Sequence, residues 1–166
     1  LNEVEAVMLS HGHVDHFGFL AAMLQKIQPG TSLSLHPDAF LERRMNVKAV
    51  KLISNLPQLN KTQLEKAKID LKITREPFLF GNGLIAASGE IERVTAFEKG
   101  FPWAEAKIDG EWVVDPFRDD QGLVVNIKNK GLVVIGGCSH AGIINTVKHC
   151  QKISGVDKVH AVLGGF

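Results

Sequence analysis

The chain has few cysteines, no long apolar run and almost no net charge. Its two cysteines, Cys138 and Cys150, are too few for a disulfide framework and fit a reducing compartment. No stretch approaches about 18 consecutive apolar residues, and the start lacks the basic-then-apolar order of a secretory signal, so we expect a cytoplasmic protein without a membrane partner. Nineteen basic and eighteen acidic residues leave no large basic surface, which argues against a nucleic-acid partner.

The remaining composition is that of one globular unit. With 45% hydrophobic and 22% charged residues among 166, the chain can bury one core, and we expect a single domain over residues 1–166. It begins at Leu1 without a methionine and ends at Phe166 directly after an apolar run. We therefore expect a domain that is incomplete at both ends, whose exposed strand edges would favour homo-oligomers.

Apolar patterning predicts a mixed α/β (α+β) fold. We expect strands at 4–9, 32–35 and 159–163, and helices at 17–27, at 39–45 after an N-cap at Asp38, and at 144–153. Residues 46–76 are more polar and are interpreted as an exposed insertion. Glycines between 77 and 127 indicate antiparallel hairpins, and the turn at 129–131 predicts one more.

Three apolar strands each end in a loop rich in glycine, serine or histidine. These loops begin at Ser10, Gly136 and Gly164. In sheets of this kind, sites form beyond the carboxyl ends of the strands. If the strands are neighbours, the following residues converge at one edge: His11, His13, Asp15, His16 and His140.

The segment from His11 to His16 reads His-Gly-His-Val-Asp-His. An extended i, i+2 pair points the imidazoles of His11 and His13 to the same side, within reach of one metal ion. Asp15 and His16 can face a second ion, and two ions at about 3.5 to 4 Å can hold a bridging hydroxide. The alternative is that Asp15 is only a helix N-cap and the histidines are exposed loop residues.

This segment matches the His-x-His-x-Asp-His signature of the metallo-β-lactamase superfamily. Together, LSHGHVDHFGFL, GCSHAGIINT and VHAVLGGF resemble the branch that includes the dihydropterin (ribofuranosylaminobenzene phosphate) synthase-like enzymes. The resemblance implies an αββα sandwich with metals at one edge of two facing sheets. It also implies that His11 and His13 bind one ion, that Asp15 and His16 bind another, and that His140 is a further ligand.

The sequence also departs from the family pattern. Where most members have a Gly-Asp pair that supplies a bridging carboxylate, this chain has Gly137-Cys138. Cys138 either coordinates or packs as a small buried residue, and we favour packing. Asp119 and Asp120 either offer a carboxylate to the site or form a solvated turn, and we favour the turn. The family branch has a further histidine after Gly-Gly-Phe, where this chain stops.

The function predicted from this resemblance is a metal-dependent hydrolase with a small-molecule substrate. A metal-bound hydroxide, positioned by Asp15 as the catalytic residue, would attack an ester or phosphoester. We expect up to two divalent ions, zinc first, with manganese or iron as alternatives. The alternatives are a pterin synthase-like condensing enzyme of methanopterin-type biosynthesis and a non-catalytic binding domain.

Other candidate residues have simpler explanations. His36 is expected to be a loop residue, and His149 and His160 to be packing or surface residues. Trp103 and Trp112 are expected to pack, although they could stack on a planar substrate. The run containing Arg43, Arg44, Lys48 and Lys51 is interpreted as a solvated helix face, without a phosphate site.

Overall fold

The structure, a computed structural model, describes residues 3–166 and contains three sheets and four α-helices within that range. The first sheet has three parallel strands: β1 (Ala6–Met8), β2 (Ser32–Leu35) and β5 (Asp70–Ile73). The second has the order β12 (Val159–Leu163), β11 (Gly131–Ile135), β10 (Leu123–Ile127), β7 (Ile85–Ala87) and β6 (Phe78–Phe80). The third is antiparallel, in the order β4 (Leu52–Asn55), β3 (Arg43–Val47), β8 (Ala104–Ile108) and β9 (Glu111–Val114).

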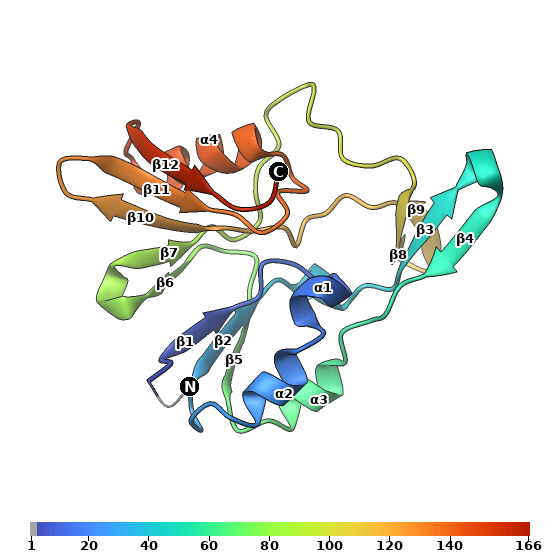
Figure 1. The fold of residues 1–166 in the computed structure, drawn as a ribbon, viewed down its shortest axis with the longest axis horizontal. Coiled ribbons are helices and arrows are strands. Elements are labelled where there is room, and N and C mark those ends of the chain that lie inside the picture. Colours follow the sequence, from blue (N-terminus) through green and yellow to red (C-terminus); the bar gives the residue numbers. More distant parts are fainter. Residues whose placement is uncertain (1–2) are drawn as a thin grey trace.

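The first two sheets lie between helical layers (Figure 1). On one side are α2 (Leu20–Leu24) and α3 (Lys61–Glu65), and on the other is α4 (Ile143–Ser154). The third sheet projects to one side of these layers (Figure 1). This arrangement confirms the expected mixed α+β class with sheets and few helices.

Each helical layer covers its own apolar cluster. Leu33 and Leu35 of β2 are fully buried against Leu20 of α2 and Leu64 of α3. On the other side, Cys150 of α4 joins a cluster with three residues of the second sheet, Val124, Leu132 and Val134. Because the strands beside these clusters are held firmly by burial, their ends form a rigid support for the loops that follow.

Two helices replace the one expected at 17–27. A short helix, α1 (Val14–Phe17), begins at Val14 with His13 as its N-cap, and α2 follows after Gly18. Asp15 therefore lies within the first turn of α1 and is not its N-cap. The helix starts inside the histidine motif, so the side chains of Asp15 and His16 leave the backbone in directions different from those of His11 and His13.

The helix expected at 39–45 is wrong. A single 3-10 turn, Pro37–Phe40, starts from His36, whose Nδ1 accepts a hydrogen bond from the Asp38 backbone N–H at 3.0 Å. The chain then extends into β3, which pairs with β8. Arg43 decides this outcome, because its guanidinium is buried between two carboxylates that lie more than 70 residues later in the chain.

The interpretation of 46–76 as an exposed insertion is also wrong. Besides a short 3-10 turn (Lys48–Val50), this stretch contains β4, α3 and β5, and β5 pairs with β2 in parallel. Leu59 and Leu64 are buried in the core. The polar residues mark the outer faces of these elements, which the composition alone did not separate from their inner faces.

The later part of the chain matches the expected elements. The β6–β7 and β8–β9 pairs are antiparallel, with a 3-10 turn (Gly81–Gly83) joining the first pair, and β10 and β11 form the hairpin around 129–131. Helix α4 and strand β12 occupy 143–154 and 159–163, and β12 runs parallel to β11. Among residues 3–166, no helix is both long and apolar enough to cross a membrane.

Candidate metal centre

Three strand ends bring their loops together. The loop after β1 is tied to the segment before β10, since the Gln121 N–H donates to the Ser10 carbonyl at 3.0 Å. The loop after β12 is tied to the loop after β11, since the Gly165 N–H donates to the Gly137 carbonyl at 2.7 Å. A Cβ atom at Gly137 would lie 2.6 Å from Ser10 Oγ, so glycine is needed for this close approach.

Four histidines meet where these loops converge. The ring centroid of His11 lies 4.7 Å from that of His13, 4.1 Å from His16 and 4.7 Å from His140. The rings of His13 and His140 are 4.8 Å apart. The convergence expected from the strand ends is therefore observed, across about 130 residues of sequence; binding of metal by these rings stays a prediction.

Asp15 and Cys138 complete the group of potential ligands. Asp15 Oδ2 lies 3.5 Å from His16 Nε2, and its side chain is largely exposed. Cys138 Sγ lies 3.1 Å from the same nitrogen of His16. Three sets of potential ligand atoms lie within 4.8 Å of one another in the described residues: His11, His13 and Asp15; His11, Cys138 and His140; and Asp15, His16 and Cys138. Cys138 thus faces the histidines, whereas packing was favoured from the sequence.

Several imidazole nitrogens in this cluster have no hydrogen-bond partner although they are buried. They are Nε2 of His11 and both ring nitrogens of His140. A buried polar atom without a partner costs free energy, and such an atom calls for an explanation such as a bound ion. Neutral imidazole is also the form that binds metals. The residues present therefore fit a metal site of the kind the motif implies.

The protonation states agree with this fit. Burial, followed by the neighbouring His13, lowers the pKa of His11 to about 2 and that of His140 to about 4. Burial also lowers the pKa of His13, with the Arg43 charge as the next cause. These three imidazoles are neutral near pH 7 and have lone pairs to offer.

Ser10 orients two of the rings. Its Oγ lies 3.2 Å from His11 Nδ1 and 2.9 Å from His16 Nδ1. A hydroxyl oxygen can accept from both Nδ1–H groups, which leaves both Nε2 atoms unprotonated and directed at the cluster. These two contacts are compatible with the tautomer in which Nε2 of each ring is free to bind a metal.

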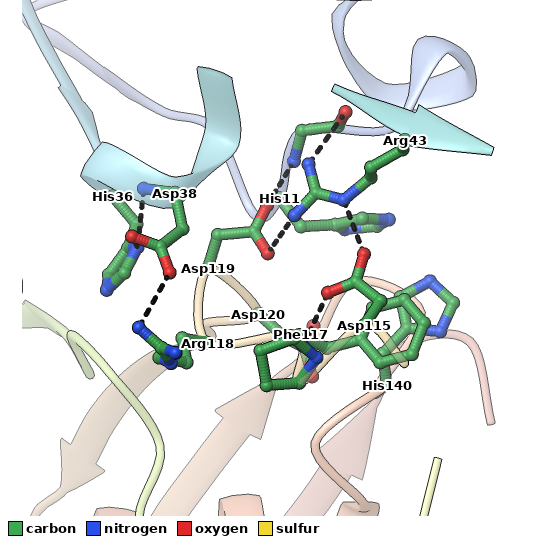
Figure 2. A network of polar contacts seen from close by, with 12 residues as sticks. His11, His36, Asp38, Arg43, Asp115, Phe117, Arg118, Asp119, Asp120 and His140 are labelled. Atoms are coloured by element: carbon green, nitrogen blue, oxygen red, sulfur yellow. Dashed lines mark hydrogen bonds and ion pairs between the residues drawn. The ribbon is translucent and has the colours of Figure 1, made fainter. Parts of the chain in front are cut away.

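A buried ion network contacts the histidine loop, the segment that carries His11, Gly12 and His13 (Figure 2). Asp119 Oδ2 accepts from the Gly12 N–H at 2.7 Å, and Asp119 Oδ1 accepts from Arg43 Nη2 at 2.7 Å. Arg43 Nε donates to Asp115 Oδ2 at 2.7 Å. The expected solvated helix face is thus wrong for Arg43, which is 4% exposed. The sequence did not reveal this network, although three carboxylates within the six residues from Asp115 to Asp120 were a signal for it.

Asp120 supports the other loop. It is 1% exposed, and its Oδ2 accepts from the Ala141 N–H at 2.7 Å, next to His140. Burial and the neighbouring Asp119 raise the pKa of Asp120 to about 7, although the Ala141 N–H opposes the shift. The solvated turn favoured for Asp119 and Asp120 is therefore wrong, because both carboxylates bind backbone N–H groups of the site loops.

An aromatic cavity of about 210 Å³ opens beside the cluster, lined by His13, Asp15 and His140 on one side. Its other walls include Phe101, Trp103 and Phe117. Phe117 stacks on His140 with ring centroids 4.7 Å apart. Trp103 is 41% exposed at this cavity, so it is not packed in the core as expected. Trp112 lies elsewhere, under the guanidinium of Arg44 at 4.1 Å.

The remaining histidines lie outside the cluster. His36 is buried and its Nε2 lies 3.2 Å from Glu90 Oε2, so it is not a free loop residue. His149 Nε2 lies 3.0 Å from the Ser88 carbonyl oxygen, in the packing role expected for it. His160 is exposed on β12, as expected.

No family model matches the chain, but two curated proteins are similar to it in sequence. It is 34% identical over 166 residues to the 7,8-dihydropterin-6-methyl-4-(β-D-ribofuranosyl)-aminobenzene-5′-phosphate synthase of Methanocaldococcus jannaschii, covering 98% of this chain and 56% of the relative. It is 32% identical over 160 residues to an uncharacterized protein of the same organism, covering 96% and 56%. The chain thus spans about half the length of the curated relatives that it matches.

A solved structure has a similar fold. The crystal structure of Tm1679, a metal-dependent hydrolase of the β-lactamase superfamily, aligns with a TM-score of 0.75 and 26% sequence identity, covering 98% of this chain and 57% of that chain. The synthase and this hydrolase are both enzymes. The fold class and the resemblance expected from the motifs are confirmed by these similarities.

Proposed function

Because the chain is similar in fold and sequence to a metal-dependent hydrolase of the β-lactamase superfamily, we propose that it is the metal-binding part of a hydrolase that cleaves an ester or phosphoester of a small molecule. The proposal treats residues 1–166 as one domain. The observation that carries it is the set of buried, unpartnered imidazole nitrogens on His11 and His140. A hydrolase that uses divalent metal needs such neutral nitrogens beside a cavity, and His140 lines the aromatic cavity together with His13.

The proposed ligands follow from the three sets of converging atoms. His11 and His13 would hold one ion, Asp15 and His16 would hold a second, and His140, whose ring lies 4.7 Å from that of His11, would be a further ligand. Up to two divalent ions are proposed, with zinc first and manganese or iron as alternatives, because mixed imidazole and carboxylate ligands suit all three. When bound, such ions polarise the ester or phosphoester oxygen and lower the pKa of water, which supplies a nucleophile near neutral pH.

The chain's own residues would orient the reactants. Asp15 is the only carboxylate among the proposed ligands. Its side chain is exposed, and its Oδ2 lies 3.5 Å from His16 Nε2. Its other oxygen, Oδ1, is therefore proposed to accept the proton of the attacking water, as a general base. Phe117 and Phe101, both within ring-contact distance of His140, exclude water from the apolar side of the cavity.

A second candidate function is supported by one observation of the site and one relative. The cavity wall of Phe101 and Trp103, with ring centroids 5.1 Å apart, suits a planar ring system, and the name of the 34% identical synthase includes a dihydropterin. In that case, the same cavity would bring two substrates together for condensation, and no water would attack.

Metal binding is tested by elemental analysis of the full-length protein purified without chelator. We expect bound divalent metal in the wild type, greatly weakened binding in His13→Ala, and unchanged binding in His160→Ala. His160 serves as the control because it is exposed on β12, outside the histidine cluster. Equal metal content in the His13→Ala and His160→Ala proteins would refute the proposed centre.

Hydrolysis is tested with a chromogenic phosphoester, with and without chelator. Chelator-sensitive turnover in the metal-loaded protein supports the hydrolase. Metal binding without turnover of esters or phosphoesters, but with product formed from a pterin and an arylamine phosphate, supports the synthase-like reaction. Metal binding with neither activity would indicate a non-catalytic binding domain.

Two further expectations remain part of the proposal. Both cysteines are free thiols in the structure, and the proposed location is the cytoplasm, where thiols stay reduced. Strand β12 and strand β1 each lie at an edge of a sheet, and pairing of such edges between two copies would give a homo-oligomer. Light scattering of the full-length protein tests the second expectation.

A further inference from the structure

The thiol of Cys138 belongs to two of the three ligand sets in the proposed centre. Cys138 Sγ lies within 4.8 Å of ligand atoms of His11 and His140 in one set, and of Asp15 and His16 in another. These two sets share no other member. His11 and Asp15 also belong to two sets each, but among the ligand sets found in residues 3–166 Cys138 is the member shared by the set that contains His140 and the set that contains His16.

A hydrogen bond accounts for the position of Cys138 beside His16, but not for its position beside His11 and His140. The 3.1 Å contact between Cys138 Sγ and His16 Nε2 is within the range of a thiol–imidazole hydrogen bond. It gives no partner to His11 Nε2 or to the two ring nitrogens of His140, which stay buried and unsatisfied although both residues have a ligand atom within 4.8 Å of the same sulfur. His11 is 1% exposed, so water does not readily satisfy its nitrogen.

The backbone also holds the thiol at this position. Cys138 follows Gly137, which lies so close to Ser10 that any side chain would overlap its hydroxyl. Ser139 adopts a left-handed conformation, with φ of 53°, and Asp120 binds the Ala141 N–H two residues later. The left-handed Ser139 and the carboxylate bound to Ala141 lie on the same side of Cys138 in the sequence, so the loop that carries the thiol has a defined shape.

We propose that Cys138 is a metal ligand shared by two ions, so that its sulfur bridges the His11–His140 side and the Asp15–His16 side of the centre. This inference rests on the proposed metal-dependent function. Binding converts the thiol to a thiolate, and the released proton passes to the solvent. Soft sulfur ligands favour zinc and cobalt over manganese and magnesium, so the bridge makes the centre selective for the zinc-like ions.

The second cysteine provides a matched control. Cys150 lies on α4 in the apolar cluster of the second sheet and is 0% exposed. It belongs to none of the ligand sets found among the described residues. Burial raises the pKa of its thiol to about 12, so it is expected to remain an inert thiol with or without metal.

Cobalt titration of the chelator-treated, full-length protein tests the bridge. In the wild type and in Cys150→Ser, we expect two Co²⁺ per chain and a sulfur-to-cobalt charge-transfer band that grows through the second equivalent. Cys138→Ser keeps a hydrogen-bonding hydroxyl for His16 but loses the sulfur, so the band should vanish and affinity should fall at least about 10-fold. A band that saturates at the first equivalent, while a second ion still binds, would show a terminal ligand and overturn the bridge.

Other outcomes separate this inference from the function on which it rests. Two Co²⁺ bound with no sulfur band, and unchanged affinity in Cys138→Ser, would overturn the bridge and leave the metal-dependent function standing. Absence of Co²⁺ binding in the wild type would overturn both.

Alkylation of the wild type keeps the test independent of whether Cys138→Ser folds. Iodoacetamide followed by mass spectrometry should modify Cys138 in the metal-free protein and spare it after Zn²⁺ is added, with Cys150 unmodified in both states. Equal labelling of Cys138 with and without Zn²⁺ would overturn the proposal.

Discussion

Replacing Arg43 by methionine tests the claim that a buried ion network supports the histidine loop. Arg43 donates 2.7 Å hydrogen bonds to Asp115 and Asp119, and its Nη1 lies 3.4 Å from the Gly12 carbonyl. All three charged side chains are at most 3% exposed. Arg43→Met keeps much of the side-chain length but leaves two carboxylates buried without a counter-charge.

The magnitude follows from that burial. Breaking a buried ion pair by removing one partner costs about 3–5 kcal/mol, because the remaining charge is uncompensated. The neighbouring Arg44 is the matched control: its pair with Glu105 is partly exposed, at 20% and 13%, and it stacks on Trp112. Arg44→Met should cost only about 1 kcal/mol.

The measurement is the free energy of unfolding in urea, with chelator present so that bound metal adds no stability. In a background of Asp115→Asn and Asp119→Asn, the Arg43→Met change should cost far less than in the wild type, because the uncompensated charges are gone. If Arg43→Met and Arg44→Met destabilise the protein by the same amount, the ion network of Arg43, Asp115 and Asp119 does not stabilise the histidine loop.

Three further changes test other parts of the structure. Asp120→Asn keeps an acceptor for the Ala141 N–H but cannot ionise. In the folded wild type, the pKa of Asp120 is about 7, above the ordinary value of 3.8. The wild type therefore loses stability as pH rises from about 4 to 7. The variant should therefore gain about 2 kcal/mol relative to the wild type between pH 5 and pH 8 in urea unfolding with chelator, and a constant difference would contradict the shift. Gly12→Ala should abolish metal binding in elemental analysis, because its Cβ would overlap the carbonyl oxygen of Ala39 and displace the histidine loop; normal metal content would show that the loop can adjust. Trp103→Ala should raise KM for an aromatic phosphoester about fivefold, roughly 1 kcal/mol of lost stacking, while KM for an aliphatic phosphoester stays nearly unchanged; equal changes would argue against a stacking wall.

Local patterns in the sequence were sufficient for the strands that end at the site. The expected strand at 4–9 contains β1, and the apolar runs at 132–135 and 159–163, bounded by glycine or turn residues, form most of β11 and all of β12. The His-x-His-x-Asp-His motif was equally informative, because metal chelation constrains residue type and spacing within six positions. These signals are local, so a single sequence contains them in full.

The tertiary structure decided what depends on distant partners. A helix was expected at 39–45, yet residues 43–47 form β3, in which Arg43 meets carboxylates that lie more than 70 positions away and β8 offers a strand to pair with. The roles of Asp119, Asp120 and Cys138 were likewise settled by which loop each side chain faces. Propensity is worth a few tenths of a kcal/mol per residue, whereas leaving a buried charge unpaired costs several, so where the two conflict the long-range partner determines the structure.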